Sequence, residues 1–336
     1  MQANQVFVRS RELSGALELR TVQLPPPAAG EAQVRVEAAG VSYGDLLQQR
    51  GVIPGGPKPP FVPGFEVAGT VEAIGPGVTG VRPGQRVAAL VKVGGYSSAL
   101  NLPAERLVPL PAEVTAVDAA AVALNYFIAW QMLTRVAGVT SGDRILVHGA
   151  SGGVGVAFLQ LAETIGDVTV WGTASARNLD VVRSYGAAPI DYRTEDFVAT
   201  INAAGPGLQA AFDPIGGPHF RRSYSLLARG GTMVGYGQNS ALRNGRRNLA
   251  VGAAGFLGGI VAPKLVPDGR RTAFYNAWSL EKSQPSAYRV DLGRVLAMLS
   301  GGQIAPRAIT VFPLAKVEQA FHLLEDGANS KIVLSG

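Results

Sequence analysis

One segment near the middle of the chain limits the possible folds more than any other. The apolar run Ile145–His148 ends in glycines, and apolar residues with helical spacing follow from Val156 to Ala162. A strand, a tight glycine turn and a helix are the parts of a dinucleotide-binding βαβ unit. Glycine permits the backbone angles of such a turn and leaves room for a pyrophosphate at the positive end of the helix. The segment predicts a cofactor-binding turn made of Ala150, Ser151, Gly152, Gly153, Val154 and Gly155.

Downstream of this turn, apolar runs alternate with amphipathic stretches. The pattern predicts strands at 168–171, 189–190, 208–212 and 232–236, and helices at 178–185, 194–204 and 219–228. Such alternation is typical of a doubly wound, mainly parallel sheet with right-handed crossovers. We therefore expect an α/β protein with a dinucleotide-binding domain over residues 123–265.

The first third of the chain has a different pattern. Short runs with period-two alternation, separated by turns rich in proline and glycine, predict strands at 5–10, 17–24, 33–39, 64–74 and 85–93. Residues 1–122 are therefore expected to form a β-rich module. The tail, residues 266–336, is expected to add a helix at 291–300, a strand at 308–313, a helix at 314–325 and a strand at 331–334.

Composition narrows the functional classes. The 336 residues are 47% hydrophobic and 16% charged, as in a globular protein, and the absence of cysteine excludes disulfides and thiolate chemistry. The net charge of +6 suits an anionic ligand without requiring nucleic acid. The first residues lack a signal-peptide pattern, and the apolar run 249–262 is too short to span a bilayer. We expect no membrane span and a cytoplasmic location.

Five motifs follow one another along the chain: Gly40-Val41-Ser42-Tyr43-Gly44-Asp45, Pro63–Gly69, His148–Gly155, Phe212–Gly217 and Lys331–Leu334. In this order they resemble the zinc-free quinone oxidoreductase (zeta-crystallin-like) branch of the medium-chain dehydrogenase/reductase superfamily. The resemblance implies a GroES-like catalytic domain to which the tail returns, a Rossmann domain between, a cofactor cleft at their junction and a homodimer. It does not fix the substrate.

Zinc-dependent relatives bind catalytic zinc through cysteine and histidine. Here Phe65 replaces the histidine of their Gly-His-Glu motif, and Glu66 follows it. The three histidines, His148, His219 and His322, stand at a strand end, a helix start and in the C-terminal helix, which does not indicate a clustered metal site. We expect each of them at the surface or the core edge, no bound metal, and direct hydride transfer to a quinone or conjugated carbonyl.

The end of the second strand indicates which nicotinamide cofactor is used. NAD-binding units usually carry an acidic residue there for the ribose 2′-OH. Here Thr173, Ser175 and Arg177 stand in that stretch, without a carboxylate, and their hydroxyls and guanidinium suit a 2′-phosphate. By resemblance, Tyr192 lies close to the same phosphate. The sequence therefore predicts NADPH.

The candidate reaction site draws on two segments. Tyr43 is a candidate proton donor and Asn125 a candidate hydrogen-bond partner of substrate or cofactor, and both are assigned as catalytic. Ser42, Asp45, Leu47 and Tyr126 are assigned to the substrate, although Asp45 serves equally well as a helix cap. The resemblance adds a cofactor wall of Gly235, Tyr236, Asn329 and Lys331. Leu46 and Leu47, where relatives often carry tyrosine, predict an apolar pocket for a hydrophobic small-molecule acceptor.

Three functions remain open at this point. The first is an NADPH-dependent reductase of quinones or similar activated carbonyls, and the second is an enone or enoyl (C=C) reductase. The third is an NADPH-binding regulatory or RNA-binding protein without turnover, suggested by the arginines at 221–222, 243–247 and 270–271. No pattern of RNA-stacking aromatic residues accompanies these arginines, so nucleic acid is disfavoured.

Overall fold

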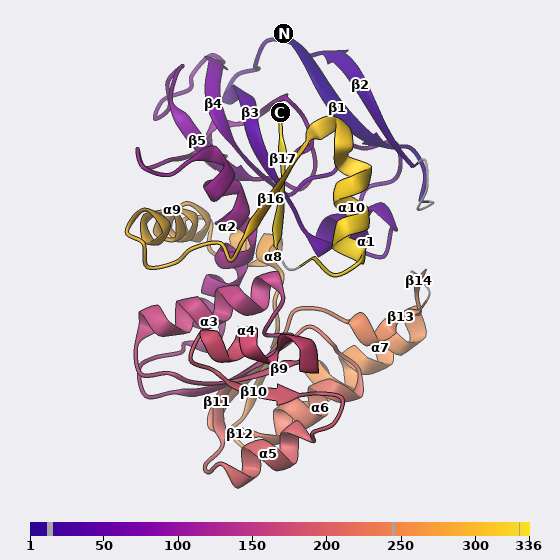
Figure 1. The fold of residues 1–336 in the computed structure, drawn as a ribbon, viewed down its shortest axis with the longest axis vertical. Coiled ribbons are helices and arrows are strands. Elements are labelled where there is room, and N and C mark those ends of the chain that lie inside the picture. Colours follow the sequence, from indigo (N-terminus) through magenta and orange to yellow (C-terminus); the bar gives the residue numbers. More distant parts are fainter. Residues whose placement is uncertain (12–15, 244–245, 329) are drawn as a thin grey trace. The chain divides into compact units, whose positions relative to one another are not determined.

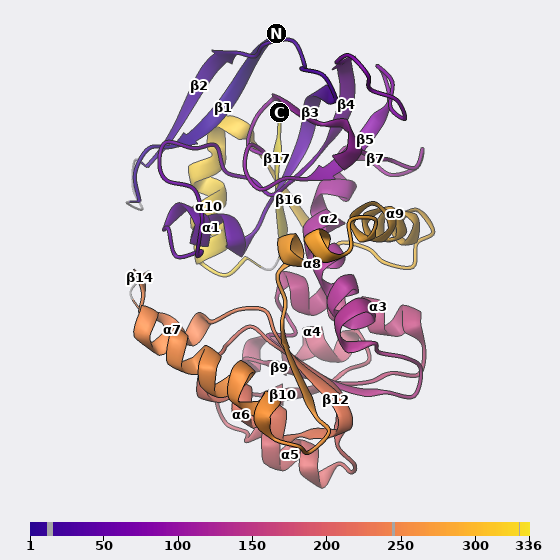
Figure 2. The same ribbon diagram turned by 180° about the vertical axis from the view of Figure 1, so that it is seen from behind.

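The computed structural model describes residues 1–11, 16–243, 246–328 and 330–336. The chain divides into two compact units, shown in Figures 1 and 2. The terminal unit contains Met1–Leu124 and Arg289–Gly336, and the central unit contains Asn125–Tyr288. The first division lies close to the expected boundary after residue 122, but the second lies after residue 288, not 265.

The later boundary has a structural cause. Residues Arg271–Phe274 form β15, which pairs in parallel with β12 (Leu227–Gly235) and becomes the edge strand of the central sheet. The segment 266–288 therefore completes the central unit, and the return to the terminal unit begins later. The sequence gives little sign of β15, because this strand is four residues long and alternates only weakly.

The central unit is built on a six-stranded parallel sheet in the order β10-β9-β8-β11-β12-β15. This is the doubly wound order, in which the connections diverge on either side of β8. Phe158 of α3 packs on Phe212 from one face of the sheet, while Phe197, Ile201 and Phe220 of α5 and α6 pack on the other. The remaining bounds are β8 Arg144–His148, β9 Thr169–Ala174, β10 Ala188–Asp191, β11 Leu208–Asp213, α3 Gly153–Ile165, α4 Leu179–Ser184, α5 Phe197–Ala203, α6 Pro218–Ser225, α7 Leu249–Phe256 and α8 Ala277–Ser283.

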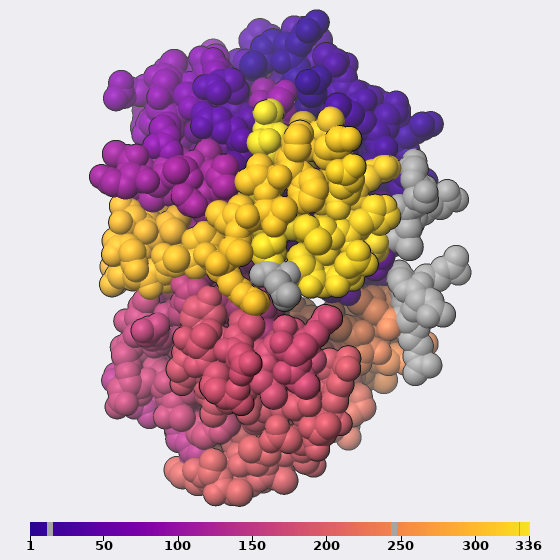
Figure 3. All heavy atoms as spheres, viewed as in Figure 1, coloured from indigo at the N-terminus to yellow at the C-terminus, as the bar shows by residue number. Residues whose placement is uncertain are grey.

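The terminal unit is a β-rich body whose main sheet follows the order β16-β17-β3-β4-β5-β7, with β6 also paired to β3. The C-terminal strand β17 (Lys331–Ser335) pairs antiparallel with β3 (Glu31–Val41), which confirms the expected return of the tail. In Figure 3 the yellow C-terminal residues lie against the indigo and purple N-terminal ones. Its other elements are β1 Gln2–Val8, β2 Leu17–Gln23, α1 Tyr43–Gln49, β4 Glu66–Ile74, β5 Arg86–Leu90, β6 Ala99–Pro103, β7 Val108–Pro109, α9 Ala287–Ser300, β16 Ile309–Pro313 and α10 Val317–Glu325.

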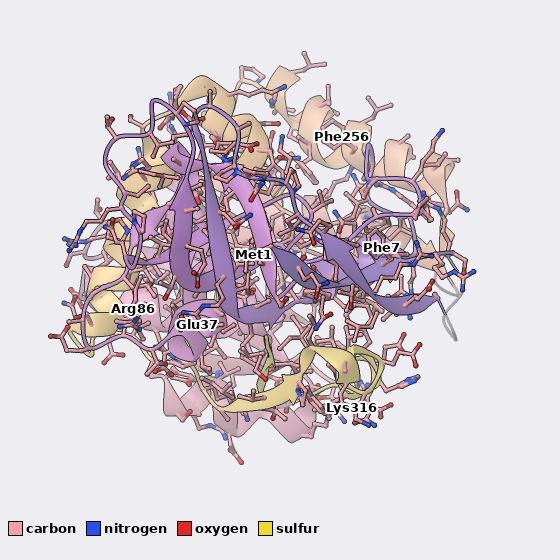
Figure 4. The ribbon with its side chains drawn as sticks, turned by 90° about the horizontal axis from the view of Figure 1, so that it is seen from above. Met1, Phe7, Glu37, Arg86, Phe256 and Lys316 are labelled. Carbon is pink, nitrogen blue, oxygen red and sulfur yellow. The ribbon has the colours of Figure 1, made fainter. Side chains whose placement is uncertain are left out.

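The core of this unit explains why the sheet forms. Alternate residues of β3, such as Val34 and Val36, are buried together with residues of β4, β5 and α10. Polar side chains line the outer face, where Glu37 of β3 accepts a hydrogen bond from Thr70 of β4. Seen from above in Figure 4, Glu37 and Arg86 mark β3 and β5, and Lys316 marks the turn before α10.

The helix α2 (Ala116–Gln131) continues as a π-helical turn to Ala137. By length and composition this stretch could cross a membrane, but 72% of its apolar window is buried inside the protein. A buried core helix passes the same test, so the stretch is weak evidence for a membrane span. The apolar run after residue 248 forms α7 and two further helical turns that end at Leu265.

Candidate functional site

The glycine turn after β8 has the geometry that a dinucleotide site requires. Gly149 has a φ of +66°, and its carbonyl accepts a hydrogen bond from Gly152 N at 3.0 Å. A Cβ at Gly155 would lie 2.3 Å from the Gly149 carbonyl oxygen, so only glycine lets α3 approach the turn this closely. Gly152 precedes the first residue of α3 and leaves the N-terminal N–H groups of the helix without a side-chain cap. Those groups are suited to an anionic phosphate.

The predicted catalytic Asn125 lies beside this turn. A Cβ at Gly153 would lie 2.5 Å from Asn125 Nδ2, so the amide sits directly over the first residue of α3. Tyr126, the next residue of α2, is buried. Burial raises the pKa of Tyr126, with smaller influences from Tyr185 and Gln160. The structure therefore brings Asn125 to the predicted cofactor turn and leaves Tyr126 as a buried residue of α2.

The carboxyl ends of β9 and β10 bring together three of the residues assigned to the cofactor phosphate. Tyr192 N donates to the Ala174 carbonyl at 3.2 Å, which places Tyr192 next to Ser175. Arg177 and Tyr192 are exposed, and the Arg193 guanidinium lies over the Tyr192 ring. The carboxylate of Asp191, which precedes Tyr192, turns back to accept hydrogen bonds from Arg193 N and the Thr194 hydroxyl. This edge thus offers hydroxyls and guanidinium groups to an anion.

The position of Thr173 differs from its predicted role as a ligand of the cofactor 2′-phosphate. Its side chain is buried, and Oγ1 contacts His148 Nδ1 at 3.0 Å and Gly149 N at 3.3 Å. The hydroxyl therefore supports the glycine turn from inside the domain and does not face a 2′-phosphate. Since side chains alternate along a strand, one residue of difference decides whether a hydroxyl points inward or toward a ligand.

The loop after β12 contains Gly235 and Tyr236, two residues of the predicted cofactor wall. Gly235 is required for packing, because a Cβ there would lie 2.7 Å from Phe220 Cζ. Tyr236 N donates to the carbonyl of Asp213, which ties the ends of β11 and β12 together. Asn329, assigned to the same wall, lies outside the described residues.

In the terminal unit, the predicted substrate residues surround the first turn of α1. Ser42 precedes the helix in extended conformation, and Asp45 Oδ2 accepts hydrogen bonds from Ser42 N and Ser42 Oγ, both at 2.8 Å. Asp45 is fully buried, whereas Tyr43 is 47% exposed and Leu47 half-buried. The structure thus shows Asp45 as the cap of α1, where it also holds the Ser42 hydroxyl; its assignment to the substrate stays a prediction.

A buried charge cluster surrounds Asp45. Lys331 Nζ pairs with Oε1 of the fully buried Glu66, and Glu66 Oε2 accepts from Leu124 N at 2.6 Å. Lys331, assigned to the cofactor, is therefore engaged as the counter-ion of Glu66. Burial raises the pKa of Asp45 to about 6, because it outweighs the hydrogen bonds from Ser42 and the charge of Lys331, and Glu66 acts in the same direction as burial.

The expectation that the histidines do not cluster is wrong for two of the three, and the expected surface or core-edge position is wrong for His148, which is fully buried. His148 and His219 stack edge to face with ring centroids 4.3 Å apart, and Asp213 lies with them. The ligand atoms of these three residues lie within 4.8 Å of one another, a group able to hold a metal ion. Ring nitrogens of both histidines take part in hydrogen bonds within the protein, since His148 Nε2 contacts Ser223 Oγ and His219 Nδ1 contacts Asp213 Oδ2.

The position of the zinc-ligating histidine of zinc-dependent relatives is taken here by Phe65. Phe65 packs over α1, within 3.3 Å of where a Cβ of Gly44 would lie. Its ring does not supply the imidazole or thiolate that zinc requires. His322, on α10, is 71% exposed and faces Glu325.

Comparison with known proteins covers nearly the whole chain. Residues 28–112 match the alcohol dehydrogenase GroES-like domain, and residues 185–334 match a domain described as zinc-binding dehydrogenase. The chain is 34% identical over 322 residues to the synaptic vesicle membrane protein VAT-1 homolog of Rattus norvegicus, which covers 95% of this chain and 80% of that protein.

Solved structures agree with both units. A quinone oxidoreductase of Pseudomonas syringae pv. Tomato DC3000 is similar with a TM-score of 0.84 and 26% identity, covering 99% of this chain and all of that one. The human synaptic vesicle membrane protein VAT-1 homolog-like protein is similar with a TM-score of 0.82 and 27% identity, covering 100% of this chain and 98% of that one. The GroES-like and Rossmann-like architecture is therefore confirmed.

Proposed function

This chain belongs to the medium-chain dehydrogenase/reductase family of nicotinamide-dependent oxidoreductases, and we propose that it is an NADPH-dependent, zinc-independent reductase of quinones or similar activated carbonyls. One observation carries the choice of cofactor. The edge formed by the ends of β9 and β10 presents Ser175, Arg177 and Tyr192, while the Asp191 carboxylate is folded into its own turn. A dianionic 2′-phosphate suits such an edge better than a ribose hydroxyl does.

The chain's own residues would bind and orient the cofactor. The N–H groups at the start of α3, freed by Gly152 and Gly153, would take the pyrophosphate, and Asn125 beside them would hydrogen-bond the cofactor or the substrate. When bound, the cofactor supplies the hydride, so the protein need only position it and provide a proton. Tyr43, which is exposed, and the Ser42 hydroxyl, which Asp45 holds, are the candidate donors.

The acceptor is proposed to be a hydrophobic small molecule. Leu47 stands half-buried on α1 next to these donors, and Phe65 occupies the position of a zinc-ligating histidine. An apolar wall without a Lewis acid favours acceptors that are already electrophilic, such as quinones. The similarity to a quinone oxidoreductase supports this choice.

The test follows the oxidation of NADPH and NADH with an ortho-quinone and, in parallel, with a linear α,β-unsaturated ketone. We expect NADPH-selective turnover of the quinone that persists after dialysis against a chelator. Faster turnover of the unsaturated ketone than of the quinone would show that the protein reduces C=C bonds, and the proposal of a quinone acceptor would be wrong. Tight NADPH binding without turnover of either, together with salt-dependent RNA binding that competes with NADPH, would support the regulatory alternative.

A pair of variants tests the assignment of NADPH as the cofactor. Arg177→Ala should raise the KM for NADPH about tenfold while changing the KM for NADH by less than about twofold, because a charge-assisted contact to the 2′-phosphate is lost. Arg183→Ala is the matched control, since Arg183 lies exposed on α4 and pairs with Asp180. Equal losses for both cofactors would contradict the assignment.

We also propose that the protein works in the cytoplasm as a homodimer. Leu249, Leu257 and Leu265 are exposed along the apolar helical segment that begins with α7. The adjacent edge strand β15 exposes Phe274, and in the described part of the chain no strand pairs with its outer edge. A second copy would cover both features. Light scattering should give twice the monomer mass, and Leu257→Asp should reduce it; a monomeric wild type would overturn the proposal.

A further inference from the structure

A continuous chain of hydrogen bonds runs inside the central unit and ends at the glycine turn. Its members come from β8, β9, β11 and α6, which are separated in sequence by up to 75 residues. The contacts are Gly149 N to Thr173 Oγ1 at 3.3 Å, Thr173 Oγ1 to His148 Nδ1 at 3.0 Å, His148 Nε2 to Ser223 Oγ at 3.0 Å, and Ser223 Oγ to Asp213 Oδ2 at 2.8 Å. The side chains of Thr173, His148, Ser223 and Asp213 are all buried.

The carboxylate of Asp213 determines which atoms donate and which accept along this chain of hydrogen bonds. Asp213 Oδ1 accepts from Ile215 N at 2.7 Å and Gly216 N at 3.2 Å, and Oδ2 contacts His219 Nδ1 at 2.7 Å. Burial alone would raise the pKa of Asp213, but the hydrogen bond from His219, the neighbouring histidines and Ser223 lower it to about 2. Asp213 is therefore an ionised carboxylate that only accepts hydrogen bonds.

The remaining proton positions follow by elimination. Ser223 has one hydroxyl proton, and its two other neighbours, Asp213 Oδ2 and the His219 carbonyl at 3.1 Å, are both acceptors. If Ser223 donated this proton to His148, a hydroxyl lone pair would face the ionised Asp213 Oδ2 at 2.8 Å, which is repulsive. Ser223 therefore donates to the carboxylate and accepts from His148 Nε2–H. In a neutral imidazole Nδ1 then carries no proton and accepts from the Thr173 hydroxyl, which in turn accepts from Gly149 N–H.

The surroundings of the ring keep it neutral. Phe197 and His219 pack against it with centroids 4.8 Å and 4.3 Å away. Burial lowers the pKa of His148 to about 3; the Asp213 charge opposes this, while His219 and Arg222 add to it. These are the charged and titratable groups that face the ring. Between pH 5 and 8 His148 therefore carries one ring proton.

We propose that His148 is a positioning residue that fixes the dinucleotide turn by linking the Asp213 carboxylate, through Ser223 and Thr173, to the amide of Gly149. The proposal rests on the proposed cofactor site. Gly149 opens the turn with a positive φ, and its carbonyl receives Gly152 N and faces Gly155, so holding its amide sets the start of α3. The chain also crosses from β9 through β8 to β11, where the strand order reverses and α/β sheets bind their ligands.

The first test needs no cofactor. NMR of protein labelled with ¹⁵N-histidine distinguishes the two neutral tautomers, and the variants His148→Asn, His219→Gln and His322→Gln assign the three rings. We expect His148 as the Nε2–H tautomer without titration between pH 5 and 8. A proton on Nδ1, or an imidazolium in this range, would overturn the chain of donors derived above.

The second test separates positioning from packing. His148→Leu removes both ring nitrogens, whereas His148→Asn keeps an acceptor near the place of Nδ1. We expect His148→Leu to raise the Kd for NADPH about tenfold and to speed hydrogen exchange of the Gly149 amide about tenfold. Its kcat at saturating NADPH should stay within about twofold of the wild-type value. In His148→Asn the Kd and the exchange rate should return part of the way to the wild-type values.

Ile201→Ala is the control, because Ile201 is buried in the same core but lies outside the chain. It should lower the melting temperature without changing the Gly149 exchange. If His148→Leu behaved like this control, His148 would be a core residue only. If the wild type bound no dinucleotide, the proposed function would fail, and the tautomer and the Gly149 exchange would still decide whether His148 holds the turn.

Discussion

The buried carboxyl of Asp45 should make the terminal unit less stable as the pH rises. Asp45 is fully buried, and its pKa lies at about 6 against an ordinary value of 3.8. A carboxyl whose pKa is raised on folding contributes stability that is complete below the unfolded pKa and is lost as the pH rises through the folded pKa. The difference between these two pKa values corresponds to about 3 kcal/mol in total. About half of this, ~1.4 kcal/mol, is lost between pH 5 and pH 8.

The perturbation is Asp45→Asn, which keeps an oxygen acceptor for Ser42 N and cannot ionise. The free energy of opening should then fall by about 1.4 kcal/mol less between pH 5 and pH 8 than in the wild type. Amide hydrogen exchange in β3 and α1, corrected for the pH dependence of the exchange chemistry, reports this unit directly. Tryptophan fluorescence would not, because Trp130, Trp171 and Trp278 all lie in the central unit.

Two charged neighbours change the size of the pKa shift of Asp45 but not its direction. Lys331 lowers the pKa of Asp45 and Glu66 raises it. Asp180→Asn serves as the control, because this side chain is 95% exposed and should leave the pH dependence unchanged. If the wild type and Asp45→Asn lost stability equally from pH 5 to pH 8, the carboxyl would already be ionised at pH 5, and the argument from burial would be refuted.

Two further substitutions test other parts of the structure. Lys331→Met should lower the free energy of unfolding by about 3–5 kcal/mol, because it leaves the Glu66 carboxylate buried without its counter-ion, and adding Glu66→Gln should recover part of the loss in urea unfolding. Gly155→Ala should weaken NADPH binding more than tenfold and lower the melting temperature, because its Cβ would meet the Gly149 carbonyl; calorimetric titration that showed unchanged affinity would contradict the close approach.

Much of the fold could be predicted from local patterns. The glycine turn after Ile145–His148, most strands and helices of the central unit and the strands β1 to β5 of the terminal unit follow from hydrophobic periodicity and turn residues. The strands β6 and β7, five and two residues long, were not predicted, because their patterns are too short. The return of β17 to β3 came from the resemblance to a family, because no local signal says which strand a tail will pair with.

The side-chain contacts within the site were harder to predict, because the residues that meet there are far apart in the sequence. His148 and Ser223 are 75 residues apart and meet only because β8 and β11 are neighbours where the strand order reverses. Thr173 has the right chemistry for a phosphate, but the pairing of β9 turns it inward. Lys331 has the charge for a cofactor, yet a buried Glu66 that stands 265 residues away takes it as counter-ion.

The two buried aspartates differ in the hydrogen bonds that they accept, and this difference decides whether each of them is ionised. Asp213 receives hydrogen bonds on both oxygens and stays ionised. Asp45 receives two on Oδ2 from Ser42 and interacts with the buried Tyr96 hydroxyl, but these contacts do not outweigh its burial. Asp45 therefore changes its protonation near pH 6. When it is ionised, the Ser42 hydroxyl proton is held by the carboxylate; when it is protonated, Ser42 can accept a proton from Asp45 and pass its own to a reduced acceptor.

This difference predicts the pH profile of the proposed reaction. If Ser42 supplies the proton, kcat/KM of the wild type should fall with a slope of about −1 on a logarithmic scale as the pH rises above about 6, because the donor form of Asp45 is lost. Asp45→Asn should give a flat profile, since its amide does not ionise in this range. His148→Asn should keep the wild-type profile, because its ring belongs to the central unit and does not titrate in this range. An inflection near pH 6 that persisted in Asp45→Asn would assign the titrating group elsewhere and remove Ser42 as the donor.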